Sequence, residues 1–420
     1  MGIQTFFTGK KMITSKQKYI WYTLGSGSLA FSTMFITIIV SHILGEYVGG
    51  YFSIGISLAQ WFSTIANFEI RTFQVTDVKK EYSFFDYFLL RFVLCIVTFG
   101  ISGIYLLSHA YSAEKSMIIF LLCIYKLLEA VADVYEGEFQ KMERIDLSGK
   151  SMFFRVVISL LTLSVSMLLT HDSILSLFLM CVFTLIVIYL LNVKMLYFFG
   201  TYPFGSTFQR MKGIFFQCLP LAIATFLNTY IINSSKFMID QYMDDRYQLY
   251  YTAVFMPNLV INLFSGIIFK PMQIKMAKYC LDNEYNSFAR VIIHVLSFII
   301  GFTILCMAGA YVAGLPVLSF VYKVDLKDYR QELLILLAAG GINAINIIFY
   351  YVMTIIRKQK YMIAIYGASA LFAYFMTRKT TQLYGIMGAA AGYLSTVIFL
   401  GLLLITTCLI LMKKEKQNNE

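Results

Sequence analysis

The stretch "SMIIFLLCIYKLLEAVADVYEGEFQ", residues 116–140, carries an apolar run straight into a charged one with no turn signal between them. An unbroken helix would place Lys126, Glu129, Asp133, Glu136 and Gln140 three and four residues apart, so all five would share one face. Lipid excludes such charges, and a helix of this kind must turn its charged face toward other helices or water. The stretch therefore predicts a bundle of helices inside a membrane.

The composition of the whole chain points the same way. Of its 420 residues, 59% are apolar and only 14% are charged, and the mean hydropathy is +0.72. Soluble domains carry about 25% charged residues. The chain is therefore expected to live in a membrane.

Long continuous apolar runs favour helices over a β-barrel, whose strands would alternate over ~10 residues. A helix needs ~20 apolar residues to cross the hydrocarbon core. The expected fold is an all-α integral membrane protein with about twelve transmembrane helices. The candidate segments are 19–42, 47–68, 86–108, 116–136, 153–170, 174–194, 213–236, 248–270, 288–312, 332–356, 361–377 and 385–412.

The distribution of basic residues sets the orientation, because basic loops resist translocation. With a cytoplasmic N-terminus, 25 of the 34 Lys and Arg residues fall inside and 8 outside, and Lys126 lies within a span. Both termini and the loop 137–152 are therefore predicted to be cytoplasmic. The first apolar segment is too long for a signal peptide and lacks a small-residue cleavage site, so it is expected to be an uncleaved span.

Twelve spans suggest two halves of six. "LAFSTMFIT" (Leu29–Thr37) opens the first half and "LAIATFLNT" (Leu221–Thr229) opens the second, with four of nine positions identical. Such halves would be parallel repeats about an axis along the membrane normal. We expect six-helix lobes over 1–200 and 201–420 with a central cavity between them.

Several classes of function find no support in the sequence. There is no phosphate-binding loop and no hydrolase, metalloprotease or kinase signature, so no catalytic residue is assigned and an enzyme is not expected. The seven cysteines lack metal-ligand spacing, and no metal or organic cofactor is predicted. The net charge of +11 follows from membrane topology, which implies contact with anionic lipid and no nucleic-acid partner.

The charged face reaches deep into the membrane. With residue 116 at the outer end, Lys126 lies roughly 15 Å in, near the midplane, and Glu136 lies near the cytoplasmic interface. Lys126 and Glu129 could form a buried pair that fixes helix register. One lysine cannot balance three acids, however, so the surplus needs cationic partners, protons or water. We favour a hydrated cavity along this face, because charge at this depth is how a transporter handles an ionic substrate or a coupling cation.

Basic residues also stand at the cytoplasmic ends of other predicted spans. Each could be an ordinary interfacial anchor, but together they would give that end a positive field suited to a phosphate-bearing substrate. The candidates for substrate binding are Arg71, Arg91, Arg155, Lys270 and, within the charged face, Lys126. Near the outer end of the seventh span, Lys236 and Asp240 are expected to pair with each other.

The segment "EGEFQKMERIDLSGKSMFFR" (Glu136–Arg155) resembles a known family. Its order of Gly137, Gln140, Arg144, Lys150 and Arg155 is similar to that of the Wzx-type lipid-linked oligosaccharide flippases. These form the polysaccharide-transporter branch of the multidrug/oligosaccharidyl-lipid/polysaccharide exporter superfamily. Length, span count and the cytoplasmic termini resemble that family over essentially the whole chain, and the basic end of the second span at Arg71 is similar too.

The resemblance implies a substrate and a mechanism. The substrate would be an undecaprenyl-pyrophosphate-linked repeat unit of O-antigen or capsule, flipped to the outer face of the bacterial inner membrane by alternating access. Coupling to a proton or sodium gradient is implied at Glu129 and Asp133. Polysaccharide polymerase and chain-length regulator would be partners. The pyrophosphate would meet Arg71, Arg91, Arg155 and Lys270.

Two other functions stay open. A multidrug/cation antiporter of the same superfamily would share the fold but gain nothing from basic groups at the cytoplasmic end. A membrane polysaccharide polymerase or ligase also has many spans, but usually needs a large outer loop that this chain lacks. The flippase is the favoured prediction.

Overall fold

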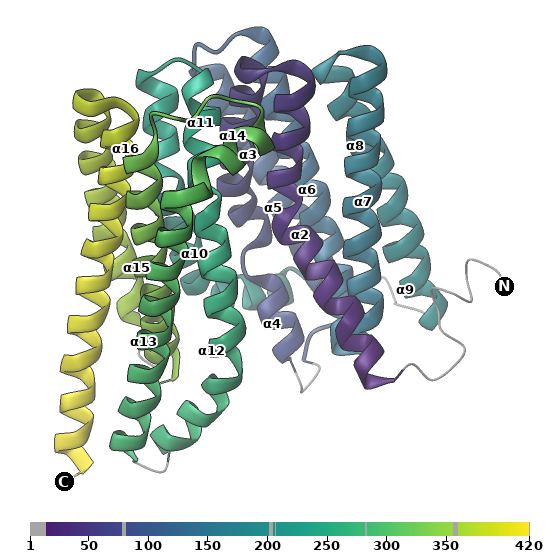
Figure 1. Ribbon diagram of the computed structural model, residues 1–420. Coiled ribbons are helices and arrows are strands. Elements are labelled where there is room, and N and C mark those ends of the chain that lie inside the picture. Colours follow the sequence, from purple (N-terminus) through teal and green to yellow (C-terminus); the bar gives the residue numbers. More distant parts are fainter. Residues whose placement is uncertain are drawn as a thin grey trace. The chain divides into compact units, whose positions relative to one another are not determined.

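The computed structural model describes residues 14–77, 81–200, 205, 207–281, 284–355 and 360–419 (Figure 1). All regular structure in these residues is helical, with no strand among them, so the predicted all-α class is confirmed. The chain divides into two compact units, Met1–Phe226 and Leu227–Glu420. The division falls inside one helix, α10 (Phe208–Tyr242). Six-helix lobes over 1–200 and 201–420 related by an internal symmetry stay a prediction.

Unit 1 is a helix bundle, and side chains cap the starts of several of its helices. Thr14 and Ser83 form capping boxes at the starts of α2 and α5, and Asp172 accepts hydrogen bonds from two backbone amides at the start of α8. The helices are α2 (Ser15–Leu44), α3 (Glu46–Asn67), α4 (Ile70–Thr76), α5 (Phe84–Ser108), α6 (Ala113–Lys141), α7 (Ile145–Thr170), α8 (Ser173–Ile188), the π-helical turn η1 (Tyr189–Val193), α9 (Lys194–Phe199) and the first part of α10.

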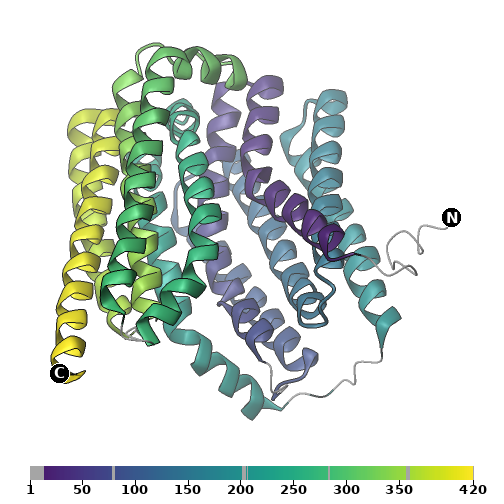
Figure 2. The same ribbon diagram turned by 60° about the horizontal axis from the view of Figure 1, so that its bottom comes forward.

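Unit 2 contains the rest of α10 and the remaining helices. α15 and α16 run side by side in both views (Figures 1 and 2) and contact each other along their length. Two expected spans, 361–377 and 385–412, lie in α16, which consists of two helical stretches joined by a kink at Gly385, whose φ of 56° suits glycine. The elements are α11 (Arg246–Phe255), α12 (Pro257–Leu281), α13 (Tyr285–Gly309), η2 (Ala310–Gly314), α14 (Leu315–Tyr322), α15 (Arg330–Ile355) and α16 (Lys360–Asn419).

The structure supports membrane crossing for some of the twelve expected segments. Among the described residues, eight helices are long and apolar enough to cross a membrane, so the predicted count of twelve is not confirmed. One of the eight, Tyr361–Leu411, holds two of the expected segments. The extreme N-terminus before Thr14 and the last residue, Glu420, lie outside the described residues. The cytoplasmic placement of both ends stays a prediction.

Helix α6, which contains the charged stretch, is the hub of unit 1. It contacts α3, α4, α5, α7 and α8. Close packing here depends on small residues: a Cβ on Gly55 of α3 would lie 2.7 Å from Leu122 of α6. Small residues at such contacts let helix backbones approach, which is how membrane helices gain packing energy without a hydrophobic drive.

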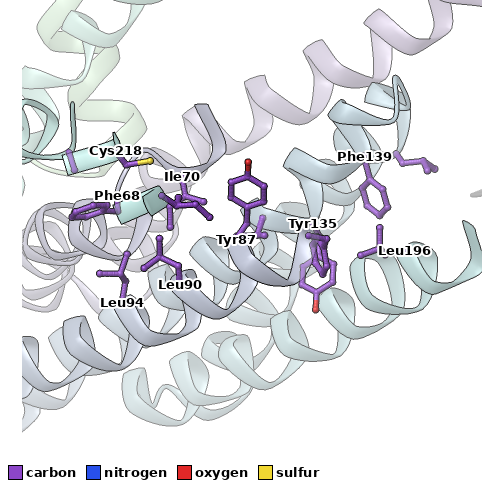
Figure 3. Packing of buried hydrophobic residues seen from close by; sticks show 14 of the residues in the cluster. Phe68, Ile70, Tyr87, Leu90, Leu94, Tyr135, Phe139, Leu196 and Cys218 are labelled. Atoms are coloured by element: carbon purple, nitrogen blue, oxygen red, sulfur yellow. The ribbon is translucent and has the colours of Figure 1, made fainter. Parts of the chain in front are cut away.

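A cluster of buried aromatic and aliphatic side chains joins the helices of unit 1 beside the charged face. Figure 3 shows Phe68, Ile70, Tyr87, Leu90, Leu94, Tyr135, Phe139, Leu196 and Cys218 of this cluster. Phe68 and Glu69 adopt left-handed backbone conformations, with φ of 44° and 54°. These two residues end α3 and turn the chain into α4, whose side chains then pack on α6.

Candidate functional site

Three arginines from three helices converge on two acids of α6. Arg71 comes from α4, Arg91 from α5 and Arg155 from α7, and they pair with Asp133 and Glu136. The spacing of three residues along α6 puts both carboxylates on one face, as the sequence predicts. All members of the cluster lie in helices of unit 1 that the structure describes.

Glu136 lies at the buried end of the cluster. It pairs with Arg155, and both side chains are 1% exposed. Its second oxygen lies 3.3 Å from Arg71 Nη1. Ser151 donates a 2.7 Å hydrogen bond to Asn192 Oδ1 and also points at Glu136. Arg71 of α4 and Arg155 of α7 cover Glu136, and its predicted depth near the cytoplasmic interface stays a prediction.

Asp133 bridges two arginines. Its oxygens lie 2.7 Å from Arg71 Nη1 and 2.9 Å from Arg91 Nη2. Arg91 also donates to the backbone carbonyl of Ala66 and to Asn67 Oδ1, at 2.9 and 2.8 Å. These acceptors end α3, so Arg91 satisfies groups that a helix C-terminus leaves open and fixes α3 and α5 to α6.

Arg71 is the most accessible arginine of the cluster, with 19% of its side chain exposed. It also reaches Gln140 Oε1 and Ser148 Oγ, at 3.4 and 3.2 Å. Burial works to lower the pKa of Arg71, but the two carboxylates outweigh it and raise the pKa above the ordinary value. Gly137 makes room for α4, since a Cβ there would lie 2.6 Å from Gln74 Oε1.

The surplus acids therefore have cationic partners. The sequence favours a hydrated cavity because Lys126 cannot balance three carboxylates, but in the structure arginines from α4, α5 and α7 supply the missing charge. Lys126 and Glu129 pair with each other, which is the alternative interpretation that the sequence left open. Their Nζ and Oε2 atoms lie 2.6 Å apart, and their side chains are 13% and 12% exposed. The stripe thus gives no evidence for a water-filled cavity in unit 1.

Lys270 is the one predicted site residue that cannot be placed beside the others. It lies in α12 of unit 2, and its side chain falls outside the described part of the structure. Over the described residues, no group of three or more His, Cys, Asp and Glu side chains could hold a metal ion.

Asn192 belongs to the site but was not predicted from the sequence. It lies in the π-helical turn η1, is fully buried and donates to the carbonyl of Ala132 while accepting from Ser151. Such turns often mark functional positions in membrane helices. A single asparagine inside the apolar run "LIVIYLLNVKM" was the available signal.

Glu69 is a carboxylate of a different kind. Its oxygens accept hydrogen bonds from the hydroxyls of Thr72 and Thr225, each at 2.9 Å. No described cation forms an ion pair with it. Within the paired cluster itself, three guanidinium groups face two carboxylates. The cluster is thus cationic by one charge, and Glu69 lies beside it as an acid held only by neutral groups.

Comparison with known proteins finds solved structures with a similar fold. The sequence matches no protein-family model and no curated protein. A structure described as the inward-facing conformation of a multidrug resistance MATE family transporter of the MOP superfamily superposes with a TM-score of 0.69 and 12% identity, over 96% of this chain and 97% of that one.

Two further structures support the same fold. A MOP superfamily transporter from Pyrococcus furiosus, for which a binding pocket of reverse polarity suggests a different function, has a TM-score of 0.61 and 11% identity, over 95% of each chain. A mutant of the Vibrio cholerae MATE transporter VcmN has a TM-score of 0.60 and 12% identity, over 95% of this chain and 97% of that one. The chain therefore has the fold of the MATE transporters of the MOP superfamily.

Proposed function

We propose that the protein is a multi-pass transporter of the bacterial inner membrane that flips an undecaprenyl-pyrophosphate-linked oligosaccharide from the cytoplasmic to the outer face. The repeat unit would belong to O-antigen or capsule. Its charged, bulky head cannot cross hydrocarbon unaided. Alternating access would carry the head through the protein while the polyprenyl tail stays in lipid. Polysaccharide polymerase and chain-length regulator would act next on the delivered unit.

The observation that carries this proposal is the charge of the α6 cluster. Every acid in the cluster is already engaged by an arginine, and one positive charge remains. A cationic drug would meet no available carboxylate there. A pyrophosphate, in contrast, can take over the exposed side of a guanidinium and form paired, charge-assisted hydrogen bonds.

Arg71 is the first candidate to meet the pyrophosphate, because it is partly exposed and bonds several neutral groups that could be exchanged for phosphate oxygens. Arg91 and Arg155, each 1% exposed, would instead hold the carboxylates that position Arg71. Lys126 and Lys270 stay proposals for the sugar or phosphate.

Ion coupling is proposed at Glu129 and Asp133. The Oε1 atom of Glu129 is buried and makes no hydrogen bond within the described residues, so it could take a proton or a sodium ion. Asp133 holds two arginines, and its release from them would change how Arg71 is oriented. Glu129→Gln and Asp133→Asn would test coupling, because each removes the charge and changes the shape of the side chain little.

A multidrug/cation antiporter is the second candidate, and the comparisons favour it, since the similar structures are described as multidrug and MATE transporters. Glu69 supplies a suitable acid, because within the described residues only hydroxyl groups bind its carboxylate. A polymerase or ligase finds no support among these structures, which are transporters.

Deletion of the gene in its native bacterium tests the proposal. Loss of surface O-antigen or capsule, with single lipid-linked repeat units facing the cytoplasm, is the expected result. Units that accumulate on the outer face would point to a polymerase or ligase. Unchanged polysaccharide with altered drug sensitivity would favour the antiporter. Complementation by Arg71→Ala should fail, whereas Arg210→Ala, an exposed arginine of the same unit, should succeed.

A further inference from the structure

Lys236 is a buried cation in unit 2 for which the described residues provide no anionic partner. It lies in α10 and is 7% exposed. The predicted pair with Asp240 is not formed, and among the described residues no ion pair reaches the Lys236 ammonium. Its Nζ instead lies 4.9 Å from the centroid of the Phe255 ring. An aromatic face attracts a cation, but less strongly than a carboxylate does in a site closed to water.

One face of α11 covers this lysine. Gln248, Tyr251, Thr252 and Phe255 are spaced by three, one and three residues, which places them together on α11. All four are buried. Gln248 Nε2 donates to the backbone carbonyl of Lys236, and Phe255 meets its ammonium, so both ends of this face contact the lysine.

The same face carries unused hydrogen-bonding atoms. Gln248 Oε1, Tyr251 OH and Thr252 Oγ1 are buried and make no hydrogen bond within the described residues. Buried polar atoms are nearly always paired, so a cluster of such atoms beside a lysine is unusual. All three can accept a hydrogen bond, and a protonated amine is a triple donor.

Within the described residues, no ion pair supplies a counter-charge here. Tyr251 is part of this face, the ring of Tyr393 on α16 lies 5.4 Å from that of Phe255, and Tyr322 is buried on α14, which contacts α11. Asp245 and Arg246 stand at the start of α11. Asp240 lies one turn further along α10. On α15, which contacts α11, Glu332 is buried, and neither acid pairs with Lys236.

We propose that Lys236 is a proton-carrying site of unit 2. Burial without a counter-ion favours the neutral amine, whereas contact with water favours the charged one. The amine lone pair takes a proton from water when the site is open, and the N–H bond formed is broken again when the proton leaves to water on the other side. The Phe255 ring holds the charged form between these events.

This role in coupling rests on the proposed transport function, but the change of protonation does not. It can be followed by carbon-13 labelling of lysine in the purified full chain, since the Cε signal reports the charge of the amine. Lys236→Arg assigns the signal by its disappearance. Lys236 should change its charge state at a pH at which a lysine in water stays charged.

Two outcomes of that titration overturn the proposal. In the first, Lys236 stays charged over the whole pH range in which a lysine in water does. In the second, its signal depends on chloride concentration, which would mean that a bound anion neutralises the ammonium. A clear titration together with unchanged polysaccharide in the deletion strain would leave the proton site standing and remove the flippase function.

Transport variants separate proton carriage from a structural contact. Lys236→Arg keeps a charge on the Phe255 ring, and Lys236→Met keeps the volume without charge. Both should fold with the thermal midpoint of the parent and lose most gradient-driven transport, while Lys327→Met, altered at an exposed lysine, keeps it. Full transport by the arginine variant would make Lys236 a structural cation and contradict the proposal.

Discussion

Arg155 of α7 and Glu136 of α6 form an ion pair in which each side chain is 1% exposed. Beside Glu136, Ser151 donates a hydrogen bond to Asn192. Arg71 contacts the other carboxylate oxygen of Glu136. The pair therefore joins α4, α6, α7 and the π-helical turn η1. Because the pair is buried, water cannot take the place of a partner that is removed.

Removal of one member of this pair should destabilise the protein strongly. Arg155→Met or Glu136→Gln leaves a buried charge without its partner, at a cost of about 3–5 kcal/mol. The double variant removes both charges and should lose less stability than the two single losses combined. Thermal unfolding in detergent measures all three. Additive losses would mean that the two side chains do not stabilise each other.

A second prediction concerns the close contact of α2 and α7. A Cβ on Gly149 would lie 2.3 Å from the backbone of Trp21, whereas a Cβ on Gly27 would meet nothing within 4 Å. Gly149→Ala must separate the helices and should cost roughly 1–3 kcal/mol, as overpacking does. Gly27→Ala, on α2 itself, is the matched control and should be neutral or slightly stabilising. Equal stability of the two variants would refute this packing.

Glu69 separates the two transport functions. If the protein exports cationic drugs, Glu69→Gln should abolish resistance, because the amide keeps the contacts with Thr72 and Thr225 but removes the charge. For a flippase, we expect Glu69→Gln to keep most surface polysaccharide and Arg71→Ala to lose it. Drug susceptibility and surface polysaccharide, measured on the same strains, decide between them. The reverse pattern would favour the antiporter.

The topology is tested by reporters inserted after Glu143, in the turn between α6 and α7, where φ is 59°. The excess of basic residues predicts that this turn is cytoplasmic. A phosphatase reporter should be inactive there and a cytoplasmic reporter active. The opposite activities would invert the orientation and place the arginine cluster near the outer face.

Local patterns in the sequence predicted the helices and the charged face of α6 well. Spacings of three and four residues put Asp133 and Glu136 on one side, and the structure places them so. The partners of these acids could not be predicted, because Arg71, Arg91 and Arg155 come from distant segments, and an arginine at a span end looks the same whether it faces lipid headgroups or a carboxylate.

Other features depend on tertiary packing that no local pattern encodes. The π-helical turn that holds Asn192 arises where α8 packs on α6 and α7. The expected pair of Lys236 with Asp240 failed for the same reason: four-residue spacing permits the pair, but α11 covers Lys236 with Phe255. Spacing within a helix shows which residues can meet, and the neighbouring helices decide which of them do.

The central claim is best tested by translocation in liposomes. The purified full chain is reconstituted with a lipid-linked oligosaccharide pyrophosphate, and a lectin outside detects sugar that reaches the outer leaflet. The parent protein should deliver sugar much faster than protein-free liposomes, Arg71→Ala should lose most of this activity, and Arg210→Ala should retain it. Delivery by the parent at the protein-free rate, or equal delivery by Arg71→Ala, would contradict the account.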